Sequence, residues 1–170
     1  MNERITLFLD IDGVMCTVKQ FNMTDQHAFW MHGDFFSGRG VYPFDGKCVE
    51  VLNGLLWQFE CDIVVSSDWR LYCTLEELQE IFKLNGVVSE PIGVTDHHPT
   101  SMSDMEKNRA GEITKYVKDN EVTKYIAIDD LDLHGFLGSE HFALCNTDWE
   151  GIKQSGLKDK IINKLNKQIT

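Results

Sequence analysis

Short apolar runs alternate along the chain with longer stretches in which apolar residues recur every three or four positions. The runs are rich in β-branched and aromatic residues and predict strands. They lie at 5–9, 62–65, 125–128 and 142–144. The longer stretches predict helices. They lie at 46–59, 74–84, 109–117 and 157–166. Thr74 and Glu77 predict a capping box on the second helix, and the segment before the third, with Pro91 and Pro99, is expected to be a loop.

This strand–helix alternation predicts a parallel sheet with helices on both faces. The expected fold class is therefore α/β, a Rossmann-like three-layer sandwich with a mostly parallel central sheet. The chain has 170 residues, a length that suits one domain spanning residues 1–170.

Composition and charge narrow the class of protein. A hydrophobic content of 42% and a charged content of 25% are typical of a globular domain. The apolar runs are too short for a membrane helix, and the first residues lack the features of a leader, so we expect a cytoplasmic protein. The five cysteines have no metal or redox spacing. A net charge of −11 disfavours extended nucleic-acid binding unless basic residues cluster locally, but a small or terminal phosphate is compatible with it.

Polar residues follow the predicted strands where each strand ends. Asp10 and Asp12 follow the first, Ser66 the second, and Asp129 with Asp130 the third, while Arg109 is expected to begin a helix. In an open α/β sheet, ligands bind just beyond the carboxyl ends of the strands. The sequence therefore predicts one site built from all of these residues.

The motifs resemble those of the haloacid dehalogenase (HAD) superfamily. They are Asp-Ile-Asp-Gly-Val after a strand, a serine closing the next strand, a basic residue leading a later helix, and Asp-Asp closing another strand. The details VVSSDWR and NRAGEI are similar to the small HAD phosphatase modules associated with RNA-repair enzymes.

The residue types suit phosphoryl transfer. An ionised Asp10 can attack phosphorus and form an aspartyl-phosphate, and Asp12 can protonate the leaving oxygen and later deprotonate water. That role requires a raised pKa for Asp12, because an ordinary aspartate is almost fully ionised at pH 7. Ser66 would donate a hydrogen bond to the phosphoryl group, and Arg109 would neutralise developing charge.

Crowded carboxylates and a phosphate need a hard cation, and Mg²⁺ suits oxygen ligands. The resemblance implies that Asp10, the backbone carbonyl of Asp12 and the Asp129/Asp130 pair hold this ion, with either member of the pair as the direct ligand. The family more often has lysine in the basic motif, so Lys107 is an alternative to Arg109.

The segment that follows Ser66 contains three candidate substrate contacts, which are Ser67, Trp69 and Arg70. For Trp69 and Arg70 the alternative is an amphipathic pair that bridges core and surface. His97 and His98 are expected to be solvent-exposed rather than metal ligands.

Residues 14–45 are rich in aromatics and, at about thirty residues, too short for an independent cap domain. HAD insertions at this point cover the active site. We expect a flap or small cap here, which would leave the site open to a large substrate. The alternative is that the aromatics cover a sheet edge.

The resulting hypothesis is a Mg²⁺-dependent phosphomonoesterase that acts on a phosphorylated small molecule, a nucleotide or a nucleic-acid terminus. The alternative is a non-catalytic HAD-like module that binds phosphate and metal. No membrane association is expected.

Overall fold

A computed structural model describes residues 4–17, 44–97 and 104–170 of the chain. The strands are β1 (Ile5–Leu9), β2 (Cys61–Val65), β3 (Pro91–Val94), β4 (Tyr125–Asp129) and β5 (Phe142–Leu144). The α-helices are α3 (Gly46–Phe59), α4 (Leu75–Leu84), α5 (Met105–Asp119), α6 (His134–Leu137) and α7 (Leu157–Ile169). Two short 3₁₀ helices are η1 (Asp68–Leu71) and η2 (Gly151–Lys153). Most of the flap segment predicted at 14–45 lies outside the described residues.

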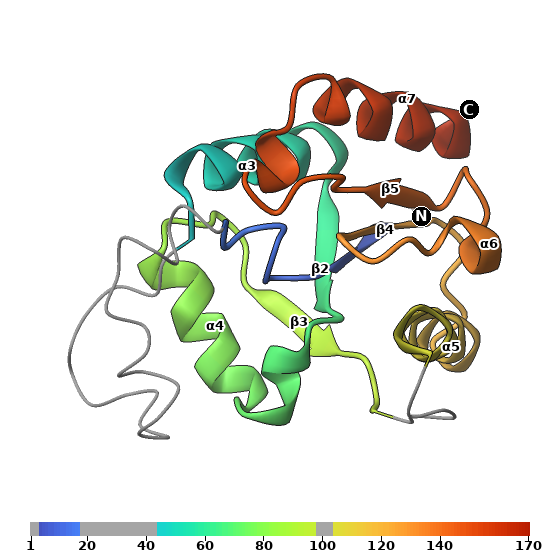
Figure 1. Cartoon of the computed structure of the whole chain (residues 1–170), viewed down its shortest axis with the longest axis horizontal. Helices are drawn as coiled ribbons and strands as arrows, with labels where there is room; N and C mark the ends of the chain where they lie inside the picture. Colours follow the sequence, from blue (N-terminus) through green and yellow to red (C-terminus); the bar gives the residue numbers. More distant parts are fainter. Residues whose placement is uncertain (1–3, 18–43, 98–103) are drawn as a thin grey trace.

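The five strands form one sheet in the order β3-β2-β1-β4-β5. Each neighbouring pair is parallel, which confirms the predicted α/β class. Helices α3 and α7 lie together on one side of the sheet and α5 lies on the other (Figure 1). Because the chain leaves β1 toward β2 and later returns to β4 on the other side of β1, the order reverses at β1. The carboxyl end of β1 is therefore the expected place for a ligand.

Alternation along the buried strands divides the core in two. Leu7 and Leu9 belong to the larger cluster, which α3, α4 and α7 complete. Phe8 belongs to the smaller cluster on the other face, which α5 and α6 complete. The two-residue period of a strand explains the division, since successive side chains point to opposite faces.

Strand β3 corrects the prediction that residue 91 and its neighbours form a loop. Pro91 is the first residue of this strand, which lies at the edge of the sheet. Proline is tolerated there because an edge position requires fewer backbone donors. The strand is also short, so its apolar pattern is weak.

Helix α5 begins at Met105, one turn before the predicted start at Arg109. The Asp104 side chain accepts a hydrogen bond from the Lys107 backbone amide at 3.0 Å and so caps this helix. The predicted capping box of α4 is confirmed. Thr74 Oγ1 accepts from the Glu77 amide, and the Glu77 carboxylate accepts from the Thr74 amide.

A segment near the C-terminus holds the turn that follows β1. The Ile152 amide, in η2, donates to the Val14 carbonyl at 3.0 Å. Gly151 precedes it with a φ of +58°, and a Cβ at this position would clash with the same carbonyl oxygen. The contact requires glycine both for its backbone conformation and for its size.

All five cysteines are free thiols and buried. Burial raises the pKa of the Cys61 and Cys73 thiols to about 12. No helix within the described ranges is long and apolar enough to span a membrane.

We predict that Gly151→Ala lowers the free energy of unfolding by about 2 kcal/mol or more, because alanine is strained at this positive φ and meets the Val14 carbonyl. Urea unfolding of the purified protein measures the effect. Gly111→Ala is the matched control. Gly111 lies inside α5 with nothing within 4 Å of an added Cβ, so alanine there should stabilise the helix by up to about 1 kcal/mol. Equal stabilities of the two variants would contradict the proposed role of the contact.

Candidate active site

The sheet register brings three predicted site residues level with one another. Leu9 pairs with Val65 of β2 and with Ile128 of β4. Asp10, Ser66 and Asp129 therefore follow at the same height on three adjacent strands. The Asp10 amide donates to the Ile128 carbonyl and the Ser66 amide to the Leu9 carbonyl, both at 3.0 Å. Strand alternation directs these side chains to the face that α5 covers.

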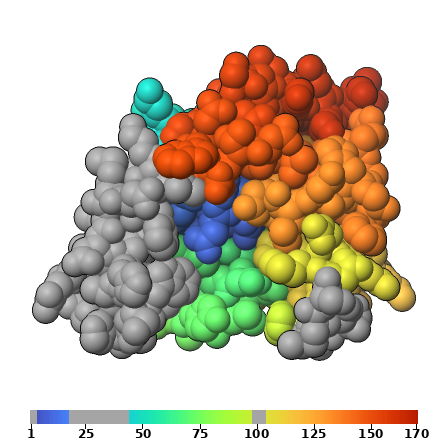
Figure 2. All heavy atoms as spheres, viewed as in Figure 1, coloured from blue at the N-terminus to red at the C-terminus, as the bar shows by residue number. Residues whose placement is uncertain are grey.

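In the view of Figure 2, with the α5 layer at the lower right, the blue N-terminal segment lies at the base of a depression. The green region around η1 lies below it, and the orange-red region after β5 lies above it. Asp10 itself is buried, as are Ser66 and Asp129. The depression thus opens at the carboxyl ends of the strands.

Arg109 lies over this row of side chains. Its Nη1 donates to Asp10 Oδ1 at 3.1 Å and to Asp129 Oδ2 at 2.7 Å. Its Nη2 donates to Asp68 Oδ1 at 3.3 Å. The guanidinium therefore joins the ends of β1 and β4 to η1. Of the two basic candidates, Lys107 is exposed on α5, so Arg109 is the one that meets the carboxylates.

The carboxylates of Asp10, Asp129 and Asp130 form a compact cluster. One oxygen from each lies within 4.8 Å of those of the other two. Asp130 lies on the solvent side, next to Gly13, which has a φ of +72°. A Cβ on Gly13 would clash with the Asp130 carboxylate, so glycine lets the two loops approach each other. Three close carboxylate oxygens are a donor set that suits Mg²⁺.

Burial and crowding disturb the ionisation of this cluster. Burial raises the pKa of Asp10, although the Arg109 cation and the Ser67 hydroxyl oppose the rise. Burial and the neighbouring Asp10 charge raise the pKa of Asp129 well above its ordinary value. Burial alone would lower the pKa of Arg109, but the surrounding carboxylates raise it, so the guanidinium stays cationic. The cluster has more negative charge than one guanidinium offsets.

Asp12 lies in a different environment. The indole Nε1 of Trp69 donates to Asp12 Oδ2 at 2.9 Å. Burial, then the Asp10 charge, raises the pKa of Asp12 to about 6, while the Trp69 hydrogen bond opposes the rise. At pH 7 a group with this pKa is protonated in about one tenth of the molecules, compared with about one in a thousand for an ordinary aspartate. This shift meets the requirement that the sequence placed on Asp12.

The two serines after β2 have different surroundings. Ser67 caps η1 by accepting a hydrogen bond from the Trp69 amide at 3.5 Å, and its side chain also bonds Asp10. The Ser66 hydroxyl is buried and finds no hydrogen-bond partner within the described residues. A buried hydroxyl of this kind is costly unless a ligand pairs with it.

Arg70 and Trp69, both candidate substrate contacts, lie inside the protein. The side chain of Arg70 is 2% exposed, and its Nη2 donates to Glu112 Oε2 at 2.5 Å. Its Nη1 donates to the Ser66 carbonyl at 3.1 Å. The other Glu112 oxygen meets His97 Nδ1 at 3.2 Å. The structure thus favours the alternative that these residues connect core and surface. His98 lies outside the described residues.

A comparison with protein families decides the affiliation. The family model for the HAD domain in Swiss Army Knife RNA repair proteins matches residues 6–155. The chain belongs to this family. No curated protein and no solved structure matches it. The predicted resemblance is confirmed, and the match extends from β1 of this HAD domain to the segment before α7.

Asp68 and Glu112 are site residues that the sequence analysis did not identify. Only the fold shows that they face Arg109 and Arg70. Both residues lie inside the two segments that resemble HAD modules, Asp68 in VVSSDWR and Glu112 in NRAGEI. That resemblance was the available signal for them.

We predict that Glu112→Gln lowers the free energy of unfolding by about 3 kcal/mol, because it leaves the buried Arg70 cation without its closest counter-charge. Chemical denaturation measures the loss. Glu80→Gln is the matched control, because Glu80 pairs with Lys83 on the surface of α4 at 3.8 Å, and such pairs contribute less than about 1 kcal/mol. A loss for Glu112→Gln as small as that of the control would contradict a structural role for the buried pair.

Proposed function

We propose that this HAD domain is a Mg²⁺-dependent phosphomonoesterase that acts through an aspartyl-phosphate on Asp10. The observation that carries the proposal is the carboxylate cluster of Asp10, Asp129 and Asp130, with Asp12 beside it. The unpaired Ser66 hydroxyl adds a buried donor at the same sheet edge. Family membership supports the same class of reaction, since HAD domains include many phosphatases.

Each side chain of the site has its own role in the proposed two-step reaction. In the first step an Asp10 oxygen forms a bond to phosphorus as the phosphorus–oxygen bond of the ester breaks, and Asp12 gives its proton to the leaving oxygen. In the second step Asp12 takes a proton from water as the water oxygen attacks phosphorus. Inorganic phosphate leaves and Asp10 is regenerated. Ser66 would hydrogen-bond the phosphoryl oxygens, and Arg109 would offset their charge.

Asp10, Asp129 and Asp130 would hold the metal, with the backbone carbonyl of Asp12 as a further ligand. When bound, Mg²⁺ supplies the positive charge that lets a phosphate dianion approach carboxylates. The donor set fits this ion, because all three ligands are oxygens within a short distance of one another.

For the substrate we propose the phosphorylated end of a nucleic acid, in preference to a phosphorylated small molecule. The support is the description of the family, which names RNA repair proteins. The alternative is a non-catalytic module that binds phosphate and metal. Such a module would be expected to have lost Asp10 or Asp12, and this chain has both.

We predict that Asp12→Asn slows hydrolysis of alkyl phosphates by about 10²- to 10⁴-fold and affects the first step with p-nitrophenyl phosphate far less. An alkoxide needs a proton as it leaves, whereas p-nitrophenolate is already a stable anion. Because the second step also needs a base, phosphoenzyme should accumulate and a burst of p-nitrophenolate should appear. Stopped-flow absorbance and acid quench measure both.

Asp10→Asn is the reference for this experiment, because it should abolish turnover of both substrates without a burst. If Asp12→Asn loses equal activity on both esters and traps no phosphoenzyme, Asp12 is not the proton donor. If the wild-type protein releases no phosphate with Mg²⁺ from any ester, the chain is a binding module.

We also predict that Mg²⁺ raises the melting temperature of the wild-type protein, because it binds the folded carboxylate cluster. At 100 times its Kd a ligand stabilises by about 2.7 kcal/mol. Asp129→Asn should lose most of this shift. Asp132→Asn is the matched control, since Asp132 lies three residues further on and is exposed, and it contacts His134 instead of the cluster. Equal shifts in the two variants would contradict the metal assignment.

A further inference from the structure

Two features on the β5 side of the depression lie outside the carboxylate cluster. One is Trp149, which is 58% exposed in the turn between β5 and η2. The other is a hollow of about 110 Å³ at the outer edge of β5. Neither has a role in the reaction described above.

The turn that carries Trp149 borders the depression. Gly151 and Ile152, directly after it, contact the Val14 carbonyl in the turn that follows Asp10 and Asp12. In Figure 2 the orange-red region after β5 overhangs the blue segment. Trp149 therefore presents an aromatic face to solvent in the turn that borders the depression.

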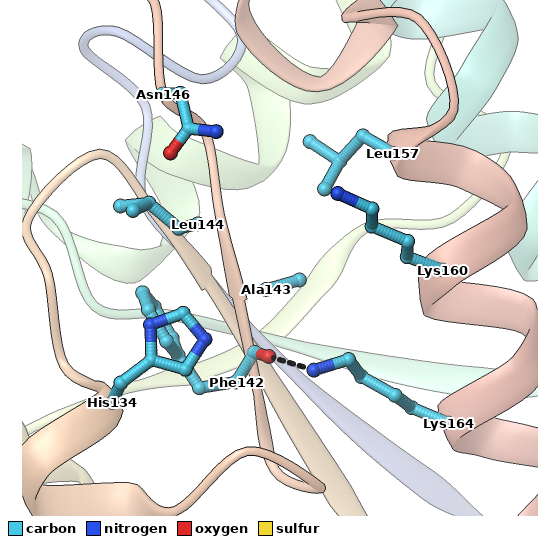
Figure 3. A pocket seen from close by; sticks show the side chains of 8 residues that line it. All are labelled: His134, Phe142, Ala143, Leu144, Asn146, Leu157, Lys160 and Lys164. Atoms are coloured by element: carbon cyan, nitrogen blue, oxygen red, sulfur yellow. Dashed lines mark hydrogen bonds between the residues drawn. The ribbon is translucent and has the colours of Figure 1, made fainter.

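The hollow lies at the same height as the site. Leu144 pairs with Asp129 across β4 and β5, and Asp129 is level with Asp10. Because β5 is two strands from β1, the distance across is roughly 10 Å. The Phe142 and Leu144 side chains lie on the His134 side of β5, and Ala143 lies on the side of the α7 lysines (Figure 3). Asn146 follows the carboxyl end of the strand.

Two lysines of α7 give this hollow its charge. Lys164 Nζ donates to the Phe142 carbonyl at 2.8 Å and to the Ser139 carbonyl, so it is held against the strand. The Lys160 ammonium points toward the hollow (Figure 3) and has no hydrogen bond or ion pair within the described part of the chain. None of the described lining residues is acidic. Acidic residues lie just outside the lining, since Glu140 is close enough to Lys164 to affect its pKa and Asp132 contacts His134. Lys160 is therefore the cation that this hollow offers to a ligand.

We propose that the first nucleotides of a single-stranded polynucleotide lie across the β5 edge, with Trp149 stacked on a base and Lys160 paired with a backbone phosphate. The inference rests on the proposed phosphatase function, with the scissile phosphate at Asp10. Proteins that bind single strands without sequence preference combine aromatic side chains that stack on bases with cations that pair with the backbone. Trp149 follows three residues after Asn146, which lines the hollow with Lys160. The net negative charge limits the contact to these few nucleotides.

We call this proposed surface, from Trp149 to Lys160, the track. Binding of an oligonucleotide to the catalytically inactive Asp10→Asn protein tests it directly. The probe is a fluorescent pentaribonucleotide with a terminal phosphate, offered in 5′- and 3′-phosphorylated forms, and fluorescence anisotropy gives the Kd. Adding Trp149→Ala should weaken binding by about tenfold or more, the effect of losing one stacked base. Adding Lys160→Gln should weaken binding and reduce the slope of log K against log salt by about 0.7, the contribution of one phosphate of a single strand.

Two substitutions of the same kind serve as controls. Trp57 is 75% exposed near the end of α3, and Lys118 is exposed near the end of α5. Both helices end where the next strand begins, so these residues lie at the opposite end of the sheet. Trp57→Ala and Lys118→Gln should leave the Kd and the salt slope unchanged.

Turnover separates this inference from the proposed function. With Asp10 intact, Trp149→Ala and Lys160→Gln should raise KM for the oligonucleotide and leave kcat and p-nitrophenyl phosphate hydrolysis unchanged. If both variants bind the oligonucleotide as tightly as their parent while the wild-type phosphatase is active, the track is wrong and the phosphatase assignment stands. If the wild-type protein hydrolyses no ester, the proposed function fails, and the track fails with it.

Discussion

The crowding of carboxylates at the carboxyl ends of β1 and β4 is the constraint that the surrounding structure satisfies. A parallel register places Asp10 and Asp129 at one height on adjacent strands, and Asp130 extends the cluster toward solvent. Positive charge that offsets these carboxylates must then come from another element. Helix α5 supplies Arg109 from the face that the strand alternation makes available. Burial still raises the pKa of Asp10, and burial together with the Asp10 charge raises that of Asp129, although Arg109 opposes both rises.

Three consecutive residues of η1 connect this cluster to its surroundings. Asp68 accepts from Arg109, Trp69 donates to Asp12, and Arg70 donates to Glu112. Arg109 and Glu112 lie one turn apart on α5, so two ion pairs join η1 to α5. In one the cation comes from α5, and in the other it comes from η1. Because Arg70 also donates to the Ser66 carbonyl, the same contacts fix the end of β2. The arrangement gives the residues after Ser66 a positioning role.

The sequence predicted most of this framework, for physical reasons that also explain the errors. Strands β1, β2 and β4 are continuous apolar runs because they are buried on both faces, and the residues at their ends identified the site. Strand β3 was missed because an edge strand that begins with Pro91 lacks such a run. The start of α5 was placed too late because its first turn is polar, although Asp104 carried a capping signal. The partners of Arg70 could not be predicted, because charged residues that meet only after folding have no periodicity.

The contact between Trp69 and Asp12 distinguishes the two oxygens of this carboxylate. An indole N–H can only donate, so Asp12 Oδ2 acts as an acceptor in either protonation state. Because a carbonyl oxygen accepts better than a hydroxyl oxygen, this bond favours a proton on Oδ1, the oxygen that Trp69 does not engage. Burial and the Asp10 charge raise the pKa of Asp12 to about 6, and the Trp69 bond opposes that rise. The same indole that orients this carboxylate therefore also limits how far its pKa rises.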